Sequence, residues 1–147
     1  MKTVFDQSTR LELIKRINSL NENSQAQWGK MTVYQMLKHC SKADEMFLGK
    51  KKYKRVPLGF LLGKIVLKKI LKDENPMQRN APTHPEFRIT GNGDVEAEKR
   101  KWIEYIESYS QFSEAYYVHW FFGKMTKEQL GYLAYKHTDH HLRQFNA

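Results

Sequence analysis

The apolar residues of this 147-residue chain recur at helical intervals in four separate segments. In the first of them, Leu11, Ile14, Ile17 and Leu20 stand three positions apart, so a helix brings them onto one face. A strand would need alternation with a period of two, which these segments lack. The four segments lie at about 8–20, 32–48, 92–113 and 126–145. The periodicity therefore predicts an all-α fold.

Three of these helices begin at recognisable capping residues. The stretches "MTVYQ" and "MTKEQ" each place a threonine three positions before a glutamine, as Thr32 with Gln35 and Thr126 with Gln129. This spacing is that of a capping box, in which the two residues satisfy free amide groups at a helix start. In "TGNGD", either Asn92 or Asp94 can cap the helix that follows.

Roughly forty residues separate the second of these helices from the third. Residues 56–71 predict a short basic amphipathic helix, interrupted by Pro57, Gly59 and Gly63, and the stretch that follows is rich in turn residues. Four amphipathic helices with one long crossover describe a four-helix bundle. A chain of this length forms one domain, so we expect residues 1–147 to fold together.

The composition favours a cytoplasmic protein. Cys40 is the single cysteine, so it cannot form an intrachain disulfide, and we expect it to be a small buried apolar residue. The N-terminal stretch has no apolar core of a secretory signal. The longest apolar run, "VPLGFLLGKIVL", is too short to cross a bilayer. We therefore expect no transmembrane segment.

The net charge of +9 comes from one segment. Residues 50–72 hold nine lysines and arginines and no acid, whereas the remaining chain has 16 basic and 16 acidic residues. The segment is either a helix with solvated lysines, or a surface for an acidic partner such as anionic lipid or nucleic acid. Its lysines could also surround a pocket and attract an acidic substrate. No nucleic-acid motif accompanies it, so nucleic acid is the less favoured partner.

Three histidines are predicted to face the interior. At about 100° per residue, His137 and His141 fall in the middle of the apolar stripe of the last helix, with Leu130 and Ala134. His39 lies centrally in the apolar stripe of the second helix. Helical geometry therefore predicts that three imidazoles from two helices point into one core.

A buried pair of histidines needs partners. A lone core histidine is most often hydrogen-bonded, but two neighbouring ones risk an unsatisfied nitrogen that costs about 1–3 kcal/mol. A divalent metal bound by neutral imidazole nitrogens removes that difficulty. The alternative is that the histidines serve only packing and that no metal binds.

Four further residues are candidates for the surroundings of the site. Gln35 and Gln144 lie on inner helix faces and are expected to orient a ligand or to cap the bundle as buried amides. His140, at the edge of the stripe, is either a proton-transfer group or a surface histidine. His119 lies within "YYVHWFF", whose aromatics either wall a pocket or belong to the core.

These histidines stand in stretches that resemble a known superfamily. His39 in "QMLKHC" and His137 and His141 in "KHTDHH" are similar to the DinB/YfiT-like superfamily. The resemblance extends over "WGKMTVYQMLKHC", "NPMQRNAPTHPEF" and the last helix, from about Trp28 to Phe145. It implies a four-helix bundle with nickel or zinc on three histidines. It also implies pairing into a homodimer through outer helix faces.

The resemblance points to an enzyme that acts on small molecules. Members with assigned activities resemble thiol S-transferases and isomerases that use low-molecular-weight thiols. Here Arg143 points away from the inner face, so a basic contact to an anionic thiol does not carry over. We expect a metal-dependent enzyme, S-transferase-like or hydrolytic. The alternative is a non-catalytic binding module that uses residues 50–72.

Overall fold

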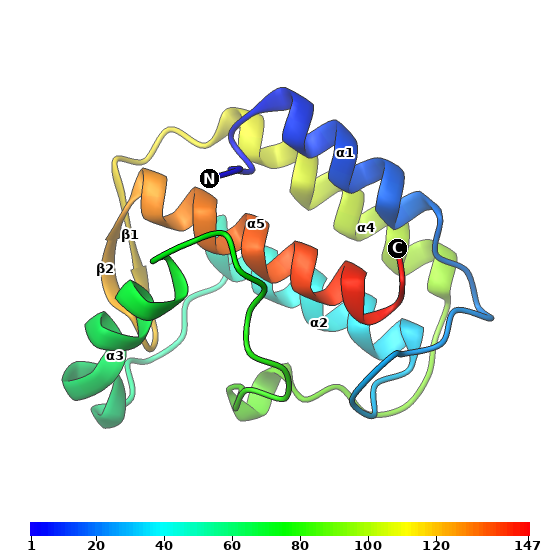
Figure 1. The fold of residues 1–147 in the computed structure, drawn as a ribbon, viewed down its shortest axis with the longest axis horizontal. Helices are drawn as coiled ribbons and strands as arrows, with labels where there is room; N and C mark the ends of the chain where they lie inside the picture. The colour runs from blue at the N-terminus through cyan, green and yellow to red at the C-terminus, as the bar shows by residue number, and fades with distance from the viewer.

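The computed structural model describes residues 1–147, and most of the chain is helical (Figure 1). Two short 3₁₀ turns, Pro85–Phe87 and Tyr109–Gln111, accompany five α-helices and two strands. The elements are α1 (Gln7–Asn18), α2 (Val33–Phe47), α3 (Pro57–Ile70), α4 (Val95–Ser108), β1 (Tyr116–His119), β2 (Gly123–Thr126) and α5 (Lys127–Gln144).

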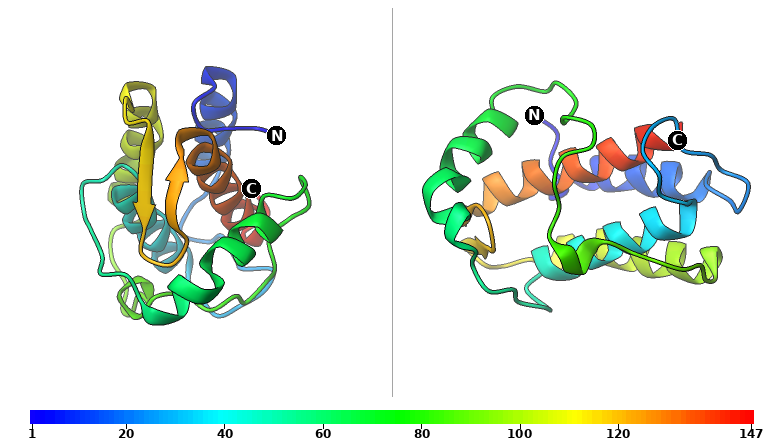
Figure 2. Two further views of the ribbon diagram at one scale, coloured as in Figure 1. Left: turned by 90° about the vertical axis from the view of Figure 1, so that its left-hand side faces the viewer. Right: turned by 90° about the horizontal axis from the view of Figure 1, so that it is seen from below.

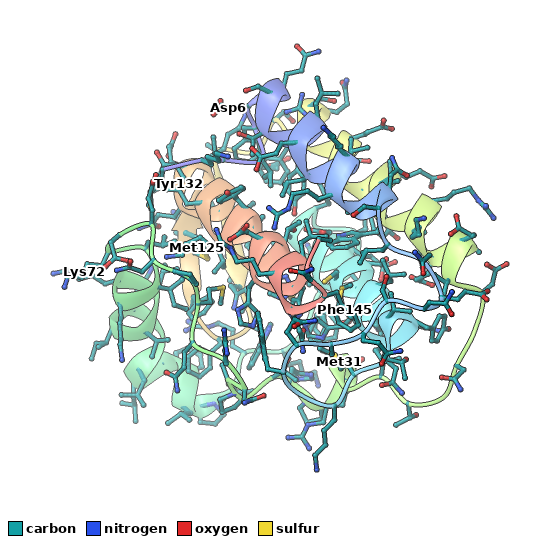
Figure 3. All side chains as sticks on the ribbon, turned by 45° about the vertical axis from the view of Figure 1, so that its right-hand side comes forward. Asp6, Met31, Lys72, Met125, Tyr132 and Phe145 are labelled. Atoms are coloured by element: carbon teal, nitrogen blue, oxygen red, sulfur yellow. The ribbon has the colours of Figure 1, made fainter.

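Four helices, α1, α2, α4 and α5, enclose one apolar core. Helix α2 packs against α4 and α5, and α1 packs against the same two helices (Figures 1 and 2). Each contributes fully buried side chains, among them Leu13, Met36, Trp102 and Leu142. Met125 and Phe145, labelled in Figure 3, are buried at opposite ends of the C-terminal region. The long crossover, predicted after the second helix, runs from α2 to α4 and contains α3.

The predicted helix starts are confirmed. Thr32 and Gln35 form both halves of a capping box, with nitrogen–oxygen distances of 3.2 and 3.1 Å. The second box, before α5, has distances of 3.2 and 3.0 Å. Asp94 caps α4 by accepting a hydrogen bond from the Ala97 amide at 2.9 Å. Asp94, and not Asn92, is therefore the cap.

One element departs from the all-α prediction. Strands β1 and β2 form an antiparallel hairpin, paired from Tyr116 opposite Thr126 to His119 opposite Gly123. Strand β1 has only four residues, too few for alternation to stand out beside the helical patterns. Gly123 has a φ of +73°, a conformation that glycine adopts without strain and that helps to close the turn.

Helix α3 forms where a basic amphipathic helix was predicted, but its glycines do not interrupt it. Gly59 and Gly63 face the hairpin turn, and a Cβ at Gly63 would lie 2.2 Å from the Phe121 carbonyl oxygen. The glycines instead allow the helix to approach that turn closely. Helix α3 therefore lies at the end of the molecule that carries the hairpin (Figure 2).

A carboxyl group joins α2 to α4 within the core. Asp44 is fully buried and accepts hydrogen bonds from Trp102 Nε1 at 2.7 Å and from the Tyr109 hydroxyl at 2.6 Å. Burial raises the pKa of Asp44 to about 7, although both hydrogen bonds oppose that shift.

None of the helices combines the length and the apolar character required to cross a bilayer.

Candidate metal centre

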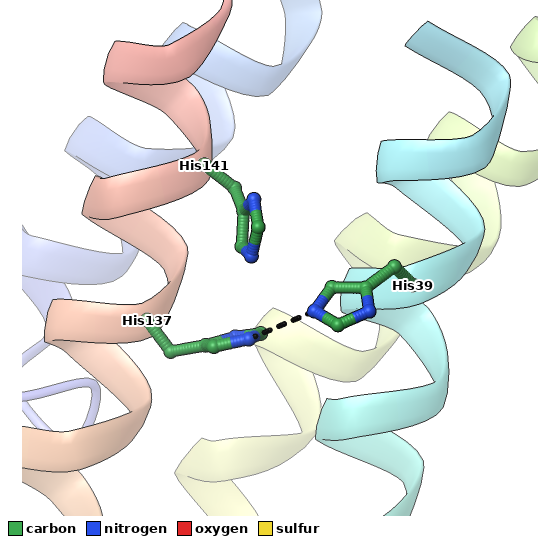
Figure 4. Close-up of side chains that lie close together, drawn as sticks. All are labelled: His39, His137 and His141. Atoms are coloured by element: carbon green, nitrogen blue, oxygen red, sulfur yellow. Dashed lines mark hydrogen bonds between the residues drawn. The ribbon is translucent and has the colours of Figure 1, made fainter. Parts of the chain in front are cut away.

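Three imidazoles from α2 and α5 meet in the interior (Figure 4). His39 comes from α2, and His137 and His141 lie one turn apart on α5. One ring nitrogen from each lies within 4.8 Å of the other two. His39 and His141 are buried and His137 is partly buried. The structure thus brings together the three histidines that helical geometry placed on inner faces.

The protonation of His39 follows from its hydrogen bond. Its Nδ1 lies 3.0 Å from the carbonyl oxygen of Phe87, in the 3₁₀ turn of the crossover. A carbonyl oxygen only accepts, so Nδ1 carries the hydrogen and Nε2 keeps a lone pair. That lone pair points toward His137 (Figure 4).

His141 is held in the same tautomer by Gln144. The Gln144 amide nitrogen donates to the Trp28 carbonyl at 2.8 Å, which orients the amide and leaves its oxygen for His141. His141 Nδ1 donates to that oxygen at 2.8 Å, so Nε2 again keeps its lone pair. Metal-binding histidines are commonly oriented in this way by an acceptor on the second ring nitrogen.

His137 completes the group without such a partner. Its Nε2 lies 3.2 Å from His39 Nε2, whereas its Nδ1 is buried and has no hydrogen-bond partner. Two nitrogens that each lie about 2.05 Å from a tetrahedral ion are roughly 3.3 Å apart. The observed distance is that of a hydrogen bond between the two rings, drawn as the dashed line in Figure 4, and the same spacing suits two ligands of one ion. His137 therefore lacks an acceptor on its second nitrogen of the kind that orients His39 and His141.

The electrostatic setting keeps all three rings neutral. Burial lowers the pKa of His39, with a further contribution from Lys42. Burial also lowers the pKa values of His137 and His141 well below the usual range, and the neighbouring histidines lower them further. Neutral imidazole is the form that binds a metal, so an ion displaces no protons at neutral pH.

A pocket of about 420 Å³ opens onto this group. Its walls come from residues 28–31, which precede α2, and from residues 77–89 of the crossover. The charged side chains that line it are Lys30 and Arg88, and no carboxylate is among them. A small molecule in the pocket would therefore touch the histidines and meet only positive charge.

Gln144 and His140 lie beside the cluster. Gln144 accepts a hydrogen bond from His141 Nδ1. The ring centroid of His140 is 5.1 Å from that of His141 and 5.6 Å from that of Trp28, and His140 lines the pocket. Burial lowers the pKa of His140 as well, although it stays partly accessible.

The other two candidates are occupied elsewhere. The Gln35 amide makes the capping box and donates to the Gly91 carbonyl at 3.1 Å, so it lines the pocket without reaching the histidines. His119 Nδ1 accepts hydrogen bonds from the amides of Phe121 and Phe122 at 3.0 and 3.1 Å. Burial lowers the pKa of His119 to about 3, and the neutral ring orders the hairpin turn.

Two contributors to the site were not identified from the sequence. The carbonyl groups of Phe87 and Trp28 orient His39 and Gln144, respectively. A backbone carbonyl leaves no side-chain signal, although both residues stand in stretches that carry the family resemblance. Cys40, as expected, is a buried thiol, in contact with the Met36 sulfur at 3.8 Å.

Comparison with known proteins identifies the family. Residues 5–147, which include all the helices and the three histidines, match the family described as "Protein of unknown function (DUF1569)". The chain belongs to this family. No curated protein and no solved structure matches it. The DUF1569 description names no activity, so the site itself is the guide to function.

Proposed function

We propose that this DUF1569 protein is a metal-dependent enzyme whose divalent ion, nickel or zinc, is held by His39, His137 and His141. We further propose that α1, α2, α4 and α5 form a four-helix bundle of the DinB/YfiT-like type. One observation carries the metal proposal. Phe87 and Gln144 hold His39 and His141 in the tautomer whose Nε2 carries no hydrogen, and each ring of the group offers one nitrogen within 4.8 Å of the other two.

The position of the pocket supports a catalytic role. Three protein ligands leave at least one coordination position open, as in catalytic metal sites. The three histidines form part of the lining of the pocket, so a small molecule bound there would reach an ion held by them. When bound, such an ion lowers the pKa of a coordinated thiol or water and polarises a substrate oxygen.

The chain's own residues supply binding and proton transfer. Lys30 and Arg88 attract an anionic substrate to the pocket mouth, and Trp28 and Phe87 give it apolar walls. His140 is neutral near pH 7, because burial lowers its pKa. A ring nitrogen of His140 can therefore accept the proton of a thiol or water bound in the pocket.

The reaction favoured by the family resemblance is thiol transfer. A low-molecular-weight thiol gives its proton to His140, and its thiolate sulfur forms a bond to an electrophilic carbon of the substrate. The leaving group departs with the electron pair of the bond that breaks. Hydrolysis, with water in place of the thiol, is the second reaction that this arrangement supports.

Conjugation of a small thiol to a chromogenic electrophile tests this proposal. The zinc- or nickel-loaded protein is expected to accelerate the reaction over the free ion, and His141→Ala to return it to background. His140→Asn is expected to retain the metal and to lose about 100-fold in kcat, because proton transfer is impaired. Equal rates for the wild type, His141→Ala and the free ion would contradict an enzymatic role.

A further inference from the structure

Helix α3 exposes a concentration of apolar side chains found on no other helix. Five of its residues are between 42% and 77% exposed, namely Leu58, Phe60, Leu61, Leu62 and Ile65, hereafter the apolar patch. On the other four α-helices, the one comparably exposed apolar residue is Leu11. Leu58, Leu61, Leu62 and Ile65 stand at helical spacing and share one face, and exposed apolar surface of this kind marks an interaction site.

The packing of α3 fixes the apolar patch outward. Gly59 and Gly63 form the inner face, and the Phe121 carbonyl oxygen lies where a side chain at either position would begin. The Val56 amide donates to the Trp120 carbonyl at 3.2 Å, and Lys136 Nζ donates to the carbonyl groups of Ile70 and Asp73 at 2.6 and 2.8 Å. Both ends of the helix are thus fastened, and rotation cannot bury the patch.

Lysines follow the apolar patch along the helix. On the exposed side of α3, Leu58, Leu61 and Ile65 occupy the first turns, and Lys68, Lys69 and Lys72 lie on or just beyond the last. A groove of about 870 Å³ runs beside them, between α3 and the start of α5. Its lining combines these lysines and Lys64 with Leu67 and Leu71. The groove therefore offers ammonium groups above an apolar floor.

We propose that α3 docks this protein on an anionic membrane surface. The apolar patch enters the boundary between headgroups and acyl chains, and the lysines bind anionic headgroups. Charge complementarity selects this partner, because residues 50–72 contain nine basic residues and no acid. No residue of α3 lines the histidine pocket, so the proposal is independent of the metal centre.

Two other partners fit the same surface less well. A second copy of the chain would bring one lysine cluster against another, with no carboxylate on the segment to pair with them. Nucleic acid would match the charge but would leave Leu61 and Ile65 in water, and bases stack on aromatic rings and not on aliphatic side chains. Lipid accommodates both features.

Cosedimentation of the full chain with vesicles tests the proposal. We expect binding to vesicles that contain phosphatidylglycerol, little binding to phosphatidylcholine alone, and weaker binding at high salt. Leu61→Gln/Ile65→Gln is expected to weaken binding about tenfold or more, because two apolar side chains leave the interface. Lys68→Glu/Lys69→Glu is expected to weaken it roughly thirtyfold.

Matched controls come from α1. Leu11→Gln removes an apolar side chain that is 61% exposed, and Lys15→Glu reverses an exposed charge. Both should bind vesicles as the wild type does, and circular dichroism should show that all variants fold. Failure of the wild type to bind anionic vesicles at low salt would overturn the proposal. The proposal would also be overturned if the wild type formed a dimer that Leu61→Gln/Ile65→Gln dissociates. The same holds if the wild type bound a DNA duplex more tightly than vesicles and this variant kept the DNA binding.

Discussion

Gln144 connects the histidine group to the segment before α2 through both atoms of one amide. Its oxygen accepts from His141 Nδ1, and its nitrogen donates to the Trp28 carbonyl. Because the Trp28 carbonyl can only accept, the amide cannot flip without losing both hydrogen bonds. The tautomer of His141 therefore depends on a residue that need not touch a ligand.

Gln144→Leu is expected to weaken zinc binding by about 10–100-fold without abolishing it, because the three nitrogens remain but His141 loses its orientation. Isothermal titration calorimetry measures the change. Gln111→Leu, an exposed glutamine outside the site, is the matched control and should bind as the wild type does. Unchanged affinity in Gln144→Leu would show that His141 needs no support from this amide.

For single residues, the sequence predicted where the three histidine side chains lie but not which ring nitrogen of each carries the hydrogen. Helical geometry placed His39, His137 and His141 on inner faces, and the structure has them within 4.8 Å of one another. It could not predict which ring nitrogen is free, because one acceptor is the Phe87 carbonyl in a turn of the crossover. The role of His119 could not be predicted for a similar reason, because it depends on hydrogen bonds from two backbone amides of the hairpin turn.

Among the elements, α2 and α4 are joined by the buried carboxyl group of Asp44. The folded chain holds the proton of Asp44 up to about pH 7, whereas the unfolded chain releases it near pH 3.8. Between these values the folded state binds more protons, so this group's contribution to stability is present at low pH and is lost as pH rises to about 7. The full change corresponds to about 4 kcal/mol.

Asp44→Asn is expected to remove that pH dependence, because an amide can still bond to Trp102 and Tyr109 but cannot ionise. Urea unfolding at a series of pH values gives the free energy of unfolding for both proteins. The difference between the two curves isolates Asp44 from the buried histidines, which act in the opposite direction. A difference that stays constant from pH 4 to pH 8 would contradict the assignment.

Helix α3 and the hairpin depend on each other through glycine. Gly63→Ala is expected to lower the free energy of unfolding by about 2 kcal/mol, because its Cβ would meet the Phe121 carbonyl oxygen at 2.2 Å. Leu62→Ala, one position away and 42% exposed, should change it by less than about 0.5 kcal/mol. Equal urea midpoints for both variants would show that the contact relaxes freely.

Helices that carry capping residues and apolar periodicity in their own sequence were predicted, whereas features that depend on contacts distant in sequence were not. Capping boxes and periodicity placed α2 and α5 to within a residue or two of their observed bounds. The hairpin was not predicted because each of its two strands has only four residues. The predicted end of α4 was too late because its apolar pattern continues into the 3₁₀ turn Tyr109–Gln111. The sequence predicts interruptions at Gly59 and Gly63 because the contact that requires glycine there lies far along the chain, at Phe121.

In the whole molecule, the long crossover contributes more to the site and to the surface than its turn-rich sequence indicated. It contributes the Phe87 carbonyl to His39, supplies much of the pocket wall, and includes α3 with its exposed apolar patch. His39 and His137 lie 98 residues apart in the sequence and meet because α2 and α5 pack together. The homodimer expected from the family resemblance stays a prediction.

The proposed function requires above all that the three histidines bind an ion together. Metal content by elemental analysis tests this directly, on protein purified without a histidine tag and incubated with zinc or nickel before gel filtration. About one ion per chain is predicted for the wild type and for the control His140→Ala, and none for His137→Ala/His141→Ala. No metal in the wild type, or equal metal in the double variant, would contradict the proposed centre.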